Sequence, residues 1–156
     1  MAALDDFVTL SAALTGIDAK KLAPDVDPIN VRQEYFDKAT RDGGEAFTKA
    51  LGAVAAKPPV TLADVLLNQS GDDVRFVCRS IILMWLTGSW YAPGDLKRYG
   101  SANPPTDPLP STVISPKAYT QGWVWSAAQA HPMGYSNLRF GYWQDQPPPL
   151  AAFVGP

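Results

Sequence analysis

The sequence predicts an all-α protein, a small domain of about five or six helices with a long, irregular C-terminal arm. Two observations support this. Apolar residues recur at helical spacing through most of the first hundred residues. After Gly100 charged residues become rare, and ten of the fifteen prolines and eight of the seventeen aromatic residues follow. A chain of 156 residues can bury a substantial core. We therefore assign residues 1–100 to a helical core and residues 101–156 to a helix plus an extended proline- and aromatic-rich arm of the same single domain.

Two helices are expected in the first forty residues. Apolar residues at helical spacing predict the first over Leu4–Thr15, and Gly16 is placed to end it. Ile17–Asp27 reads as a loop. A second helix is expected to open at Pro28 or just after it, and to run to about Arg41.

Glycine and proline then separate two further helices. Gly43-Gly44 is expected to break the chain before a third helix over Glu45–Ala56, and Pro58-Pro59 to stop that helix. Thr61 has the spacing of an N-cap to Asp64, three residues on, which predicts a short fourth helix.

The fifth helix, within Asp72–Tyr91, has the clearest pattern, and we expect the core to form around it. Ser70 is placed to cap its start and Gly88 to end it. Its apolar face has the spacing of one side of a helix and consists of Val74, Val77, Cys78, Ile81, Ile82 and Trp85. This pattern indicates a structural helix, since none of these residues forms a catalytic constellation.

One further helix is expected after Gly100. The prolines from Pro104 to Pro110 exclude a helix there. Ser115-Pro116 is a good helix start, and the sixth helix is expected to run from it to about Ala130. No helical or strand period is visible beyond Pro132.

Composition excludes several classes of function. A net charge of −2 gives no basic surface for nucleic acid. One cysteine and one histidine are too few for a cysteine-based metal cluster or a multi-histidine metal site. No apolar run is long enough to span a membrane. The first residues are acidic where a signal peptide is basic, so we expect a sequence that starts without a leader or after one was removed.

Two single residues could carry chemistry, and each has a simpler interpretation. Cys78 lies on the apolar face of the fifth helix, so we expect a buried small hydrophobe rather than a reactive thiol or a bridge to a partner. His131 follows the predicted sixth helix, where a cation near the last carbonyls is favoured over a general base or haem ligand.

Aromatic residues with few charges around them indicate a protein interface. Trp and Tyr are the residue types that anchor such interfaces. The candidates at the exit of the fifth helix and in the arm are Trp90, Tyr91, Trp123, Trp125, Tyr135, Tyr142 and Trp143. A monomer that folds the arm over its own core is the alternative.

Three segments together resemble a known family. They are Leu14-Thr15-Gly16, then Trp85-Leu86-Thr87-Gly88 with Trp90-Tyr91, and Tyr135 with Gly141-Tyr142-Trp143 before Pro147-Pro148. In this order the chain resembles the small (gamma) subunit of membrane-associated FAD-dependent sorbitol, fructose and glucose dehydrogenase complexes. The segment WLTGSWY is the strongest part of the resemblance.

The resemblance implies a non-catalytic subunit without a cofactor of its own. In such complexes a GMC-type flavoprotein carries FAD and oxidises the sugar or polyol, and a multihaem cytochrome c subunit passes electrons to the membrane. The small subunit binds and stabilises the flavoprotein as a heterodimer and escorts it to the periplasm, usually with a twin-arginine leader. Two alternatives remain: a free-standing helical adaptor for an unrelated partner, and a small enzyme that uses His131.

Overall fold

The computed structural model describes residues 2–27, 29–128 and 130–132, and the single positions 144, 146, 149 and 151. This part of the chain is mostly helical, which confirms the all-α prediction. None of its helices is long and apolar enough to cross a membrane. In chain order the elements are α1 (Ala2–Thr15), α2 (Ala19–Leu22), α3 (Val31–Ala56), α4 (Pro59–Asp64), the π-helix η1 (Val65–Gln69), α5 (Asp72–Thr87), β1 (Ser89–Trp90), α6 (Pro93–Tyr99), β2 (Thr112–Val113), α7 (Pro116–Thr120) and α8 (Trp123–Ala127).

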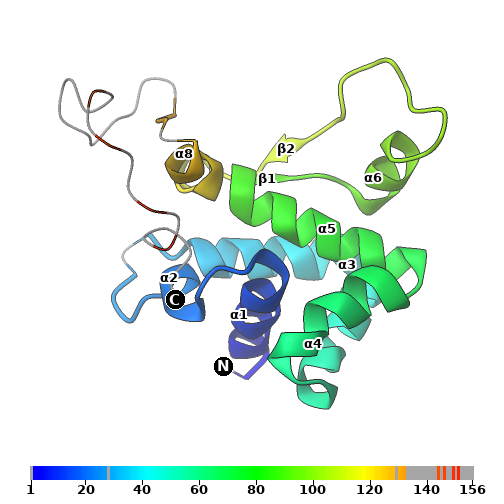
Figure 1. Cartoon of the computed structure of the whole chain (residues 1–156), viewed down its shortest axis with the longest axis horizontal. Helices are drawn as coiled ribbons and strands as arrows, with labels where there is room; N and C mark the ends of the chain where they lie inside the picture. Colours follow the sequence, from blue (N-terminus) through cyan, green and yellow to red (C-terminus); the bar gives the residue numbers. More distant parts are fainter. Residues whose placement is uncertain are drawn as a thin grey trace.

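Helix α5 lies at the centre of the fold and contacts α1, α3 and α6 (Figure 1). Aromatic rings join these helices in the core. The ring of Phe7 on α1 lies 6.3 Å from Trp85 on α5 and 6.0 Å from Phe47 on α3. Tyr35 on α3 meets Trp85 edge to face at 4.7 Å. Such pairs add to the stability gained from burying apolar area, so the rings fix how the three helices cross.

The apolar face predicted for α5 is the face that is buried. Val74, Val77, Cys78, Ile81 and Trp85 are buried, and Ile82 is half-buried. The prediction for its end is confirmed, because Gly88 is the C-cap with φ 69°.

The expected cap at the start of α5 is wrong. Gly71 occupies the N-cap position, and the Ser70 hydroxyl donates instead to the Val65 carbonyl at 3.0 Å. That carbonyl belongs to η1, whose π-helical turn directly precedes Ser70. The hydroxyl therefore serves the end of one helix rather than the start of the next.

Two expected helices form the single, kinked helix α3. Gly44 interrupts its helical geometry with φ 57° and ψ −146°, at the place where the sequence predicted a break. A β-carbon at this φ would be strained, which is why glycine serves here. The helix begins at Val31, after Asn30 in a left-handed conformation. The expected opening residue, Pro28, lies outside the described residues.

Two local predictions before α5 need correction. The loop expected over residues 17–27 contains the short helix α2, which starts where the Asp18 carboxylate accepts from the Lys20 amide at 2.7 Å. Helix α4 begins before Thr61, whose hydroxyl donates to the Pro58 carbonyl at 3.2 Å. The Asp64 carboxylate accepts from two amide side chains of η1 and takes no part in a capping box.

The chain beyond α5 returns to the core through a short strand pair. Strands β1 and β2 run antiparallel, with Ser89 opposite Val113 and Trp90 opposite Thr112. The sixth helix expected from Ser115-Pro116 to Ala130 is instead α7 and α8, separated at Gln121-Gly122. The expectation of one continuous helix is therefore wrong. The two helices separate where the backbone packs closely on the end of α5, as described below.

Candidate partner-binding surface

The C-terminal end of α5 holds the segment from β2 to α8 against the core. The Gly88 amide donates to the Met84 carbonyl at 2.9 Å, and the Gly88 carbonyl accepts from the Ile114 amide at 3.1 Å. The backbone of α7 passes so close that a β-carbon on Gly88 would lie 2.2 Å from the Ala118 carbonyl oxygen. Only glycine fits both the left-handed φ and this contact.

A second glycine, Gly122, permits a close approach between the end of α5 and the turn that follows α7. A β-carbon on Gly122 would lie 2.8 Å from the Leu86 carbonyl oxygen. Gly122 is the N-cap of α8, so the turn between α7 and α8 lies directly on the end of α5. The expected continuous helix is thus broken where its backbone meets that of α5. We call this meeting of α5 with α7 and α8 the glycine junction, defined by Gly88 and Gly122.

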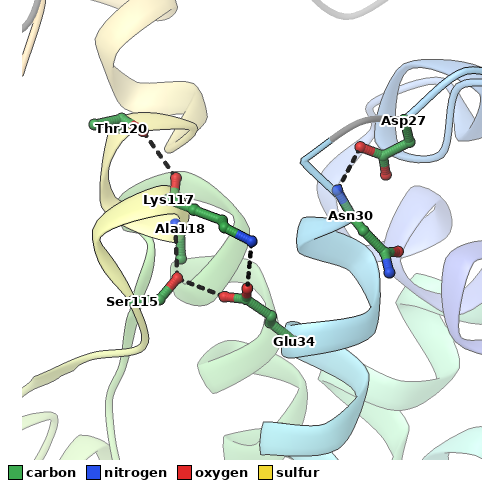
Figure 2. Close-up of polar contacts among 7 residues, drawn as sticks. All are labelled: Asp27, Asn30, Glu34, Ser115, Lys117, Ala118 and Thr120. Atoms are coloured by element: carbon green, nitrogen blue, oxygen red, sulfur yellow. Dashed lines mark hydrogen bonds and ion pairs between the residues drawn. The ribbon is translucent and has the colours of Figure 1, made fainter.

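Polar contacts with the first turns of α3 complete the attachment (Figure 2). The Ser115 hydroxyl donates to the Glu34 carboxylate at 2.5 Å and accepts from the Ala118 amide at 3.1 Å, so it caps α7. Lys117 Nζ lies 3.7 Å from Glu34 Oε1. The Tyr35 hydroxyl donates to the Ala118 carbonyl at 3.4 Å. Burial, and next the Glu34 charge, raise the pKa of Tyr35 well above its usual value, so the phenol stays protonated and remains a donor.

Helix α8 places two tryptophans in different roles. The Trp125 indole N–H donates to the Tyr119 carbonyl at 2.8 Å, and its ring meets the Tyr119 ring edge to face at 5.4 Å. Trp125 therefore ties α8 to α7. Trp123 is half-buried, packs against the core, and forms one wall of a groove.

This groove is mostly apolar and has a volume of about 200 Å³. It lies between the turn that precedes α3, the core, and the start of α8. Its lining residues are Lys21, Leu22, Pro24, Val26, Asp27, Ile29, Val31, Trp85, Gln121 and Trp123. We call it the Trp123 groove.

The floor and the rim of the Trp123 groove differ in exposure. Leu22, Val31 and Trp85 are buried, whereas the Val26 side chain is 83% exposed at the rim. The turn that carries the rim is held by the backbone amide of Asn30, which donates to the Asp27 carboxylate at 2.7 Å (Figure 2). Val26 is thus an apolar side chain left in water at the edge of an apolar groove.

The interface residues predicted from the sequence have different environments. Trp90 is only 5% exposed and belongs to the core, so little of its ring is accessible. Tyr91 and Trp125 are half-buried, and the Tyr91 carbonyl accepts from the Ser80 hydroxyl at 2.7 Å. Of the predicted interface residues that the structure describes, only Trp123 lines the groove. Tyr135, Tyr142 and Trp143 lie outside the described residues.

The two residues considered for chemistry lie apart from the groove lining. Cys78 is buried, as expected, and desolvation raises the pKa of its thiol to about 12, which disfavours the reactive thiolate. His131 is exposed, and its Nδ1 lies 3.1 Å from the Pro132 carbonyl oxygen. Helix α8 ends at Ala127, so His131 does not directly follow the helix as the sequence predicted. Among the described residues no group of three or more histidine, cysteine, aspartate or glutamate side chains is placed to hold a metal ion.

Sequence reasoning missed the half of the groove that comes from the turn before α3. Pro24 and Val26 fall in a stretch that reads as a plain loop, and Ile29 falls at the expected start of the second helix. The available signal was three apolar residues in six positions, in a segment where polar residues are usual. Comparisons with protein-family models, curated proteins and solved structures find no match to this chain.

Proposed function

We propose that this chain is a non-catalytic small subunit that binds and stabilises an FAD-dependent GMC-type sugar or polyol dehydrogenase. The Trp123 groove is the observation that carries the proposal. It combines a half-buried tryptophan, an apolar floor and the highly exposed Val26, which are features of the centre of a protein interface.

The size of the groove favours a protein partner over a small-molecule substrate. Sites for small molecules usually enclose about 300–1,000 Å³. The groove has about 200 Å³, which suits one or two side chains of a partner. Anchor side chains that fill such pockets contribute a large part of the binding energy in many interfaces.

The choice of partner rests on the resemblance of WLTGSWY and its companion segments to the small subunits of sugar dehydrogenases. In this proposal FAD and the substrate site belong to the flavoprotein, and a multihaem cytochrome c subunit completes the complex. Periplasmic location and escort during export, usually by a twin-arginine leader, belong to the same proposal.

Two exposed valines offer a matched test. Val26 is 83% exposed at the groove rim, and Val60 is 89% exposed on α4. Val26→Asp places a charge that must lose its water on binding, so we expect the Kd for the flavoprotein to rise about tenfold or more. Val60→Asp adds the same charge outside the groove, and its Kd should equal that of the wild type. The measurement is titration of the purified holo-flavoprotein with each chain.

Co-expression tests the stabilising role. The flavoprotein is produced with and without this chain, and its yield, FAD content and activity are compared. Equal values in both cases would refute the proposal. A helical adaptor for an unrelated partner would use the same groove, and a native-extract pull-down that loses one defined non-flavoprotein in Val26→Asp, but not in Val60→Asp, would favour that alternative.

A further inference from the structure

We propose that the loop between α6 and β2 is a second binding segment, which docks its prolines into a partner surface lined by tryptophan and tyrosine. The inference rests on the proposed function, because it places that surface on the flavoprotein. Pro104, Pro105, Pro108 and Pro110 lie in this loop, and they take no part in the Trp123 groove.

The loop is presented to solvent. Figure 1 shows it as a wide excursion of the chain that stands clear of the helices. Pro104, Pro108 and Pro110 are exposed, whereas Pro105 and Leu109 are half-buried. The loop therefore offers three proline rings on its outer side.

The loop is also held in place. Helix α6, which precedes the loop, packs on α5, and strand β2, which follows the loop, pairs with β1. The Tyr99 hydroxyl at the end of α6 donates to the Pro108 carbonyl at 3.2 Å, and the Ser101 hydroxyl at the start of the loop donates to the Arg98 carbonyl at 2.8 Å. Each proline fixes its own φ and restricts the residue before it. The prolines and the anchored ends thus reduce the conformational freedom that the loop loses on binding.

The chemistry of the segment selects the kind of partner. Proline has no amide N–H, so its backbone contributes carbonyl acceptors, and its ring presents a flat apolar face. Proteins that recognise such segments use grooves lined by aromatic rings, which pack against the prolines while indole or phenol groups donate to the carbonyls. Asp107 is the single charged residue from position 101 to position 111, so docking of the loop would bury few charges.

The first test compares two variants of the full chain. Pro104→Ala/Pro108→Ala/Pro110→Ala removes the three exposed rings, and we expect the Kd for the purified holo-flavoprotein to rise about tenfold through lost packing and lost preorganisation. Thr106→Ala/Ser111→Ala trims two other side chains of the same loop and should bind as the wild type does. Circular dichroism and urea unfolding establish that both variants keep the helical core.

Photo-crosslinking supplies a second measurement that does not depend on affinity. A benzoylphenylalanine in place of Thr106 should crosslink to a flavoprotein peptide that contains tryptophan or tyrosine on its surface, whereas the same group at Val60 should not crosslink. Wild-type affinity of the triple proline variant, or no crosslink from position 106 in a complex that forms, overturns this inference alone. If the wild-type chain does not bind the flavoprotein, the proposed function fails and this inference fails with it.

Discussion

Replacement of Gly88 by alanine tests whether the glycine junction holds α7 and α8 in place. At φ 69° an alanine residue costs roughly 1–2 kcal/mol. Its β-carbon would also lie 2.2 Å from the Ala118 carbonyl oxygen, so α7 must move by about 1 Å. That movement breaks the hydrogen bond from the Ile114 amide to the Gly88 carbonyl and the one from the Tyr35 hydroxyl to the Ala118 carbonyl, each worth about 1 kcal/mol. We expect a total loss of about 3–4 kcal/mol in the free energy of unfolding.

Gly16 provides the matched control. It also has a positive φ, 72°, at the end of a helix, but a β-carbon there would meet no atom within 4 Å. Gly16→Ala should therefore cost only the backbone strain, about 2 kcal/mol less than Gly88→Ala. Gly122→Ala separates the two causes in the opposite way, because its φ of −56° suits alanine while its β-carbon would lie 2.8 Å from the Leu86 carbonyl oxygen.

The assay is urea unfolding followed by far-ultraviolet circular dichroism. Tryptophan fluorescence is recorded in parallel, because Trp123 and Trp125 lie on the segment that should move. Equal losses in Gly88→Ala and Gly16→Ala would refute the reasoning, since the close approach to α7 would then contribute nothing to stability.

Two further predictions concern the attachment of α7 and the buried thiol. Ser115→Ala should lower the free energy of unfolding by about 1 kcal/mol in the same urea assay, because it removes the N-cap of α7 and the hydrogen bond to Glu34. Lys117→Ala breaks only an exposed ion pair, so it should change the free energy of unfolding by less than about 0.5 kcal/mol. Burial raises the pKa of Cys78 from 9.0 to about 12, so above pH 9 the thiol ionises only in the unfolded state and stability falls as pH rises towards 12. Cys78→Ala should lose less stability between pH 8 and pH 10 than the wild type, and parallel losses would contradict the assignment.

Sequence patterns predicted the core well because its signals are local. The apolar spacing within α5 depends on one helix alone, and the break at Gly43-Gly44 reflects the conformational freedom of glycine. Both were placed correctly. Ser70 was misassigned because its hydroxyl has two nearby backbone groups to serve, and only the π-helical turn before it decides between them.

The candidate site was harder to predict because it depends on contacts between distant segments. Gly122 breaks the expected sixth helix through its approach to Leu86, 36 positions earlier, and no local pattern signals such a contact. Trp90 was expected at a partner surface, yet pairing of β1 with β2 accompanies its burial. The strands have two residues each, too few to show alternation.

The residues of WLTGSWY have structural roles that explain the segment without a partner. Trp85 lies in the aromatic core, and Gly88 allows α7 to approach. The Thr87 hydroxyl donates to the Leu83 carbonyl at 2.8 Å and accepts from the Ser89 amide at 3.3 Å. These roles belong to the glycine junction, so the residues of WLTGSWY are explained by the packing of α5 against α7 and α8. Under the proposed function, choice of partner then depends on residues that the junction positions, Trp123 above all. A chain that keeps WLTGSWY and the circular dichroism spectrum of the wild type, but carries charged residues at positions 26 and 123, should therefore fail to bind the flavoprotein. Normal binding by such a chain would show that the groove is not the interface.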